Sequence, residues 1–271
     1  MGVKQVNARD VREYLKTMDG GWVNWENTVD TFKSGDPTTE VRGIAVGWMG
    51  YTWTLQRALE LDCNMFITHE PTYYNHHDTD QNVFRYQGVA AKRKMIEDSE
   101  LIILRCHDLW DQVPEIGIPD SWATQLGFEY PVDGEGYFRV YDVSGQTALT
   151  IAQRVAGKVK ELGQNSVQLI GPEDQPVSRV AIGTGAITPL TSFIDNYQVD
   201  LAICTDDGFT YWRDGAFSID MGVPVIVVNH AVSEIHGMKL LADHLADRFS
   251  PLPVHFIPQS CIFKLVQASK N

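Results

Sequence analysis

The sequence predicts an α/β fold built from two layered α/β lobes of related topology. Apolar runs of strand length alternate with helical segments along most of the 271 residues. These runs are apolar almost throughout, which is typical of parallel strands that helices cover on both faces. A turn-rich segment, residues 129–137, separates two stretches with the same strand and helix rhythm. We therefore expect one lobe from residues 1–128 plus 220–271 and a second from residues 129–219.

The first lobe is expected to begin with a helix and then to alternate strands and helices. Asn7 can cap that first helix, and Gly20 and Gly21 end it. Further strands are expected at residues 41–48, 63–70 and 100–108, with helices at 52–62, 82–99 and 120–126. Each of these strands is rich in β-branched or other apolar residues, as a buried strand requires.

The second lobe is predicted from the same alternation, after which the chain returns to the first lobe. Strands are expected at residues 138–143, 166–170, 179–183 and 199–207, with helices at 148–162 and 190–197. The return consists of a strand at 223–230, an amphipathic helix at 233–249 and a last strand at 252–257.

Composition excludes several classes of protein. A formal charge of −13 would repel phosphate backbones, so we expect no general nucleic-acid binding. The longest apolar runs, such as VPVIVV at 223–228, are far shorter than the ~20 residues of a membrane span. The first residues lack the apolar core of a signal peptide. Four widely spaced cysteines indicate reduced thiols, and we expect a cytoplasmic protein.

Side chains able to bind metal follow three of the predicted strands. They are His69 and Glu70, then His107, Asp108 and Asp111, and last His230 and Glu234. In α/β sheets, ligands gather beyond the carboxyl ends of the strands, where connecting loops converge. His230 and Glu234 are four residues apart, so a helix beginning there would present both on one face. Such sets of imidazoles and carboxylates suit zinc, iron or manganese.

These motifs resemble those of the Nif-three-like family (NGG-interacting factor three), whose members are often labelled GTP cyclohydrolase type 2 homologues. That family has THHP after its second strand, HTNLD after its third and GH-x-x-T/S-E near the C-terminus. This chain has THEP at 68–71, HDLWD at 107–111 and NHAVSE at 229–234. NWENTVD at 24–30, AIGTGA at 181–186 and CTDDG at 204–208 are similar to three further family segments, in the same order.

The resemblance implies a dinuclear metal site at the interface of the two lobes. The implied ligands are His69, Glu70, Asp111, His230 and Glu234, with Asp111 and Glu234 each bridging both ions. His107 and Glu234 are the implied catalytic residues, with His107 moving protons beside the site. At position 70 a glutamate replaces the usual histidine, which adds negative charge.

The replacement at Glu70 bears on the metals that the site would prefer. Two divalent ions are expected, and iron, manganese and zinc are the candidates. A carboxylate is a harder ligand than an imidazole, so Glu70 should shift the preference from zinc towards manganese, iron or magnesium. Glu70 could instead turn away and leave a mononuclear site, and Asp108 competes with Asp111 for its role. His76, His77 and Asp78 are expected at the rim, and the resemblance makes Asp206 a pocket-wall residue.

The leading interpretation is a metal-dependent hydrolase. A metal-bridging hydroxide would attack a nucleotide-like, phosphoester or cyclic C–N substrate. The alternative is a non-catalytic metal-binding scaffold or a protein for metal storage and delivery, whose ions would be closed off by protein ligands. A nucleotide-binding module without metal is disfavoured because the glycine fingerprint is missing. The resemblance also implies self-association as a ring-shaped homohexamer.

Overall fold

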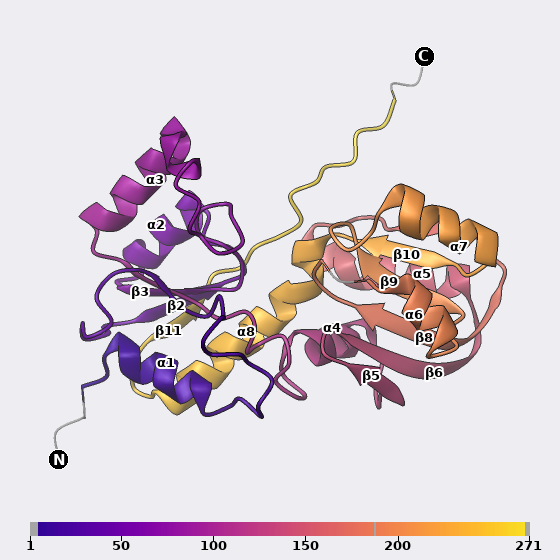
Figure 1. Ribbon diagram of the computed structural model, residues 1–271, viewed down its shortest axis with the longest axis horizontal. Helices are drawn as coiled ribbons and strands as arrows, with labels where there is room; N and C mark the ends of the chain where they lie inside the picture. The colour runs from indigo at the N-terminus through magenta and orange to yellow at the C-terminus, as the bar shows by residue number, and fades with distance from the viewer. Residues whose placement is uncertain (1–4, 187, 269–271) are drawn as a thin grey trace. The chain divides into compact units, whose positions relative to one another are not determined.

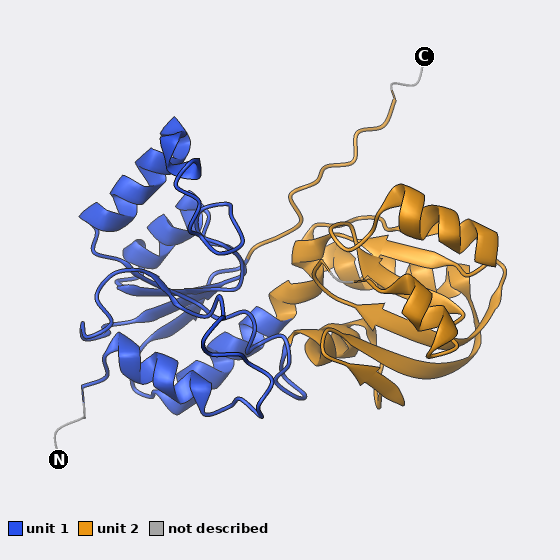
Figure 2. Ribbon diagram, viewed as in Figure 1, with its two compact units in different colours: residues 1–117, 237–258 blue, residues 118–236, 259–271 orange. Residues whose placement is uncertain are grey.

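The computed structural model describes residues 5–186 and 188–268, which form two compact units (Figure 2). Unit 1 comprises the described residues up to Gly117 together with Gly237–Pro258. Unit 2 comprises Ile118–His236 and the tail from Gln259. The lobes expected from the sequence divide the chain differently: residues 118–128 and 220–236 lie in unit 2, and so does the tail from Gln259. Across the described residues, no helix combines the length and apolar character that crossing a membrane requires.

Unit 1 is built on a five-stranded sheet with strand order β1-β4-β3-β2-β11. The strands are β1 (Phe32–Ser34), β2 (Ile44–Gly47), β3 (Met65–Thr68), β4 (Ile102–Arg105) and β11 (Val254–Phe256). β2, β3, β4 and β11 run parallel, and β1 pairs antiparallel with β4. Every residue of the three central strands is buried, as expected for a sheet covered on both faces.

Helices cover both faces of this sheet (Figure 1). Helices α2 (Thr52–Glu60) and α3 (Gln87–Asp98) lie on one face, with a short 3₁₀ turn, η1 (Val83–Arg85), before α3. Their buried residues, among them Leu55 and Ile96, pack with Phe66 of β3 in one hydrophobic cluster. Helix α1 (Ala8–Lys16) and the part of α8 from Gly237 onward lie on the other face.

Unit 2 is built on a six-stranded sheet with strand order β5-β6-β8-β9-β10-β7. The strands are β5 (Asp133–Glu135), β6 (Phe138–Thr147), β7 (Gln168–Ile170), β8 (Pro176–Gly183), β9 (Leu201–Thr205) and β10 (Val225–Val228). β8, β9 and β10 are parallel, whereas β5, β6 and β7 pair antiparallel with their neighbours.

Alternate residues of β9 pack into two different hydrophobic cores, one on each face of the sheet of unit 2. Leu201 and Ile203 pack with helices α4 (Ile118–Leu126) and α5 (Ala148–Val159) on one face. Ala202 packs on the other face, with helix α6 (Leu190–Asp195). This alternation between faces, with a period of two residues, is expected for a strand between two helical layers.

The remaining helical segments of the chain are η2 (Lys160–Leu162), η3 (Tyr211–Gly215), α7 (Ala216–Met221) and α8 (His230–Arg248).

Local differences from the sequence prediction have physical causes. The helix expected at 82–99 is interrupted at Tyr86, whose ψ of 130° is extended backbone. The turn-rich segment 129–137 contains β5, which pairs with β6. The last helix begins at His230 rather than at residue 233, because Asp206 accepts a hydrogen bond from the backbone N–H of His230 at 2.7 Å and so holds its first turn.

Candidate metal-binding site

In unit 1 the parallel pairing of β3 with β4 brings the first two predicted clusters to one edge of the sheet. Thr68 pairs with Arg105, so the residues that follow each strand, His69 with Glu70 and Cys106 with His107, leave the sheet side by side. The turn after β4 then closes, because the backbone N–H of Asp111 donates to the carbonyl of His107 at 2.9 Å.

The ligand-type atoms of this edge lie close together. His69, Glu70 and His107 each offer an atom within 4.8 Å of those of the other two, a spacing that could hold a metal ion. His69 Nε2 lies 3.4 Å from Asp111 Oδ1, and His107 Nδ1 lies 3.1 Å from Asp111 Oδ2. The two imidazole rings stack with their centroids 4.4 Å apart. Unit 1 therefore gathers two imidazoles and two carboxylates.

The orientation of His69 is fixed by the backbone. Its Nδ1 lies 3.2 Å from the carbonyl oxygen of Cys106, which can only accept, so Nδ1 carries the proton and Nε2 presents its lone pair. Arg105, fully buried, donates from Nε to the carbonyl of His69 at 2.7 Å. Its Nη2 lies 3.9 Å from Glu70 Oε2, so a buried cation partly offsets the charge of that carboxylate.

His107 is held in its charged form by two carboxylates. Burial acts to lower the pKa of His107, but the Asp111 carboxylate and a hydrogen bond with Asp108 outweigh it and raise the pKa to about 9. Burial likewise raises the pKa of Asp108, but hydrogen bonds from His107 and Thr28 place it well below its usual range. In the protein without metal, His107 thus carries a proton at neutral pH.

Asp108 and Asp111 occupy different surroundings. Asp108 Oδ2 accepts from the Thr28 hydroxyl at 2.7 Å and from the Val29 N–H at 3.2 Å, so this carboxylate ties two loops together. Asp111 instead faces His69 and His107.

Asp30, to which no role was assigned from the sequence, shapes the loop after β4. Its two carboxylate oxygens accept from the backbone N–H groups of His107, Asp108 and Leu109 at 2.7, 3.1 and 2.9 Å. Burial raises the pKa of Asp30, and these backbone donors lower it. The one feature of the sequence that could have pointed to Asp30 is its position as the last residue of the segment NWENTVD, which is similar to a family segment.

The residues expected at the rim are in part exposed. His76 and His77 are exposed, and the His76 ring centroid lies 6.0 Å from that of His107. Asp78 accepts from the backbone N–H groups of Thr72 and Tyr73 at 3.0 and 2.6 Å, so it stabilises the loop that follows His69 and Glu70.

In unit 2 a second cluster forms at the carboxyl edge of the parallel strands β9 and β10. His230 is the first residue of α8, and its Nε2 lies 3.0 Å from Glu234 Oε1 one turn later. Its Nδ1 lies 2.7 Å from Asp207 Oδ2, so Nδ1 carries the proton and Nε2 faces the Glu234 carboxylate. The hydrogen bond with His230 lowers the pKa of Asp207 against the opposing effect of burial.

A glycine leaves room beside this pair. Gly185 has a φ of +58°, and a Cβ there would lie 3.1 Å from Glu234 Oε1 and 3.7 Å from His230 Nε2. Its carbonyl accepts a hydrogen bond from the Thr205 hydroxyl, which ties the AIGTGA turn to the end of β9. A side chain at this position would occupy the space next to both potential ligand atoms.

The family model DUF34/NIF3 (NGG1p interacting factor 3) matches residues 29–261 of the chain. The chain belongs to this family. The resemblance inferred from the motifs is thereby confirmed. A curated relative, the GTP cyclohydrolase 1 type 2 homolog of Chlamydia pneumoniae, is 22% identical over 264 residues, covering 93% of this chain and 98% of the relative.

Solved structures of low sequence identity share the fold. Protein SA1388 of Staphylococcus aureus matches with a TM-score of 0.77 and 16% identity, covering 97% of this chain and 100% of the other. A Bacillus cereus protein related to NIF3 matches at 0.74 and 11%, with 99% and 100% covered. Reduced HcgD from Methanocaldococcus jannaschii matches at 0.68 and 15%, with 97% and 100% covered. The predicted α/β fold with two sheets is confirmed.

Proposed function

We propose that this protein binds two divalent metal ions and uses them as a metal-dependent hydrolase. The proposed ligands are His69, Glu70, Asp111, His230 and Glu234. The substrate would be nucleotide-like, a phosphoester or a cyclic C–N compound, in keeping with the name of the Chlamydia relative, a GTP cyclohydrolase 1 type 2 homolog.

The same histidine arrangement in both units carries the proposal. At the edge of each sheet a histidine bonds through Nδ1 to an oxygen atom and directs Nε2 toward a carboxylate. The Nε2 to carboxylate distances are 3.4 Å for His69 with Asp111 and 3.0 Å for His230 with Glu234. Metal-binding histidines are oriented in this way by an acceptor on the second nitrogen. Gly185 also keeps a side chain away from Glu234 Oε1 and His230 Nε2, the two atoms that would bind an ion here.

Bound divalent ions would supply a hydroxide near neutral pH and polarise a substrate oxygen. Asp108 and Asp111 stabilise the charged form of His107 at Nδ1, and His107 would donate the proton on its other ring nitrogen, Nε2, to a leaving group. Arg105 keeps the backbone of His69 in place and lies near Glu70, so the additional negative charge at position 70 has a buried partner. With a carboxylate at position 70, we expect manganese, iron or magnesium to be favoured over zinc.

Metal analysis of matched variants tests the ligand set. Protein purified without chelators should carry close to two metal equivalents per chain by mass spectrometry. Asp111→Asn should lose at least one equivalent, because an amide is a weaker ligand than a carboxylate. Asp108→Asn is the matched control on the same turn and should keep both, since its carboxylate binds Thr28 and Val29. Unchanged metal content in Asp111→Asn and in Glu234→Ala would reject the ligand set.

Turnover assays separate the enzymatic proposal from metal binding alone. A panel of phosphoesters and cyclic amides should reveal hydrolysis that a chelator abolishes and manganese, iron or zinc restores. A protein that holds two ions but hydrolyses nothing across such panels would instead be a metal-binding scaffold or storage protein.

Self-association is the remaining part of the proposal. Tyr211 and Trp212, at the start of η3, are 85% and 76% exposed, which is unusual for neighbouring large aromatic side chains and typical of an interaction surface. A homohexamer would have six times the mass of the chain by light scattering.

A further inference from the structure

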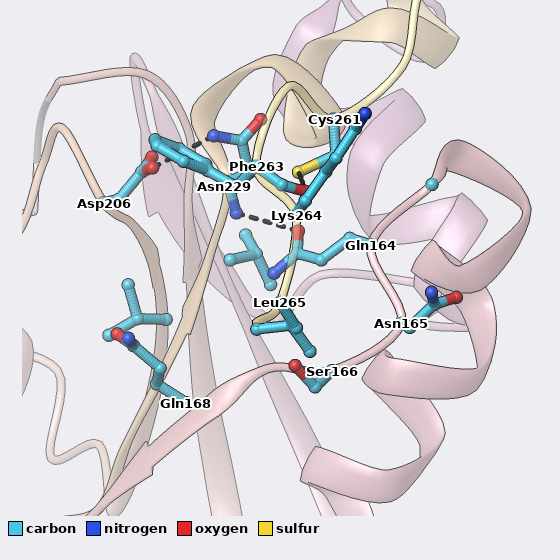
Figure 3. Close-up of a pocket in the computed structure, with 13 residues that line it drawn as sticks. Gln164, Asn165, Ser166, Gln168, Asp206, Asn229, Cys261, Phe263, Lys264 and Leu265 are labelled. Atoms are coloured by element: carbon cyan, nitrogen blue, oxygen red, sulfur yellow. Dashed lines mark hydrogen bonds between the residues drawn. The ribbon is translucent and has the colours of Figure 1, made fainter. Parts of the chain in front are cut away.

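A cavity of about 530 Å³ lies at the carboxyl edge of β9 and β10 in unit 2 (Figure 3). Asp206, which directly follows β9, and Asn229, which directly follows β10, both line it. Ligands of α/β sheets bind at this edge, and the volume suits a small organic molecule. The proposed metal ligands do not line the cavity, so it is a second candidate site in unit 2.

The Asp206 carboxylate gives one part of this cavity a negative charge. Its Oδ1 accepts from the backbone N–H of His230 at 2.7 Å, and its Oδ2 accepts from Asn229 Nδ2 at 3.0 Å. Both donors are uncharged N–H groups, so they leave the charge of the carboxylate in place. Each carboxylate oxygen has two lone-pair directions, so both oxygens can accept once more. Asp206 therefore favours a ligand that brings a positively charged donor.

Beside Asp206, the Asn229 side chain presents a buried acceptor. Asn229 is 7% exposed, and its Oδ1 has no hydrogen-bond partner among the described residues. The bond from Nδ2 to Asp206 fixes which end of the amide is oxygen, because an ionised carboxylate can only accept. A buried acceptor without a partner favours a ligand that brings a donor. An ammonium group has three N–H donors and a positive charge, so it can satisfy both Asp206 and Asn229.

Donor groups also line the cavity (Figure 3). Gln164 Oε1 accepts from the backbone N–H of Asn229 at 2.9 Å, so Nε2 of the same amide is the donor left for a ligand. Lys264, in the C-terminal tail, adds a positive charge. The backbone N–H of Cys261 donates to the carbonyl of Leu162 at 2.8 Å, which anchors the tail beside the cavity. An ammonium group and an amide N–H together suit a carboxylate.

The two charges of the cavity together favour a zwitterion. A ligand with only a positive charge would be repelled by Lys264, and one with only a negative charge would be repelled by Asp206. The surface between these groups is in part apolar, with Val228 contributed by β10 and with Phe263 and Leu265 contributed by the tail. Apolar side chains of a ligand would lose water on contact with this surface.

We propose that this pocket binds a short zwitterionic peptide with apolar side chains. The ammonium group of the peptide donates to Asp206 and to Asn229 Oδ1. Its terminal carboxylate accepts from Lys264 and from Gln164 Nε2. A cavity of about 530 Å³ is larger than one amino acid fills, so the peptide has at least two residues. The inference goes beyond the proposed function, because peptide binding uses none of the proposed metal ligands and requires no metal.

Isothermal titration calorimetry of the full-length protein with the dipeptide leucyl-leucine tests the ammonium end of the pocket. N-acetyl-leucyl-leucine, in which an amide replaces the ammonium group, should bind about tenfold more weakly, the scale of one lost hydrogen bond to a charged group. Changing the ligand leaves Asp206 intact, which is necessary because Asp206 also holds the first turn of α8. The affinity for leucyl-leucine should be the same before and after treatment of the protein with chelator.

A variant of the tail tests the carboxylate end. Lys264→Ala should weaken binding of leucyl-leucine about threefold, the scale of one exposed ion pair. The same variant should bind leucyl-leucine amide, which has no carboxylate, as tightly as the wild type does. Lys158→Ala is the matched control, because it also removes an exposed positive charge from unit 2, but from α5, where Lys158 does not line the pocket.

Four results would overturn the proposal. The first is no binding of leucyl-leucine at millimolar concentrations, and the second is binding of the N-acetyl dipeptide as tightly as the free one. The third is an equal effect of Lys264→Ala and Lys158→Ala on the affinity for leucyl-leucine. The fourth is binding that chelator treatment abolishes, which would place the dipeptide on a bound metal ion and not in this pocket. Metal content, measured separately, tests the proposed function and does not depend on any of these results.

Discussion

Removing the Asp111 carboxylate should change the protonation of His107 in the metal-free protein. Asp111 lies 3.1 Å from His107 Nδ1 and is the strongest influence that raises the pKa of this histidine against burial. In Asp111→Asn we therefore expect the pKa of His107 to fall from about 9 toward or below 6.5, its ordinary value. Asp62→Asn, a change at an exposed carboxylate in another loop, should leave it unchanged.

The shift corresponds to a measurable part of the stability of unit 1. A rise from 6.5 to about 9 is worth about 3 kcal/mol at ~1.4 kcal/mol for each pKa unit. Because the pKa is higher in the folded state, this stabilisation is fully present below pH ~6.5 and disappears as the pH rises through about 9. Metal binding should follow the opposite trend and tighten as the pH rises, since ligands must lose their protons to bind an ion.

Two assays measure the effect directly. Nuclear magnetic resonance of protein carrying ¹³C-labelled histidine, with His107 assigned from a His107→Gln variant, gives the pKa. Urea unfolding at pH 6 and pH 9.5 gives the free energy, and the difference between wild type and His107→Gln isolates this residue. A His107 pKa below 7 in the chelated wild type, or a pKa unchanged by Asp111→Asn, would refute the electrostatic account.

Two further predictions concern a glycine and a buried lysine. Gly185→Ala should lose metal, because its Cβ would lie 3.1 Å from Glu234 Oε1. Gly145→Ala is the control and should keep its metal, because Gly145 is also at positive φ but has open space around it. Mass spectrometry compares the metal content of the two variants, and equal contents would contradict the reasoning. Burial lowers the pKa of Lys92, which donates to the Thr72 carbonyl, to about 8. Its folded pKa lies below its unfolded one, so stability should rise between pH 9 and 10.5 by urea unfolding, and Lys92→Met should remove that rise.

The strands that carry the site were predictable because they are buried on both faces. β3, β4 and β10 each lie inside a predicted apolar run, and only a central parallel strand requires such a run. The edge strands β1 and β5 were not expected. Each has three residues and depends on pairing with a partner strand, β4 in one case and β6 in the other, which a local pattern does not reveal.

For the candidate site, the sequence predicted which residue types gather but not what each contacts. It left Asp108 and Asp111 as competitors, and only the structure assigns Asp108 to Thr28, 80 residues earlier in the chain. It also missed Asp30, whose partners at His107 and beyond are 77 or more residues away. Contacts of this range follow from tertiary folding, so spacing along the chain carries no record of them.

The main-chain anchoring of the loop after β3 has a consequence for position 70, where we propose a metal ligand. The carbonyl of Trp48 accepts from the N–H groups of His69 and Glu70 at 3.0 and 2.9 Å, so the place from which side chain 70 projects is set without any help from that side chain. An imidazole or a carboxylate can stand there on an unaltered scaffold. Under the proposed ligand set, a single substitution at position 70 would alter the metal preference while the course of the loop stays the same.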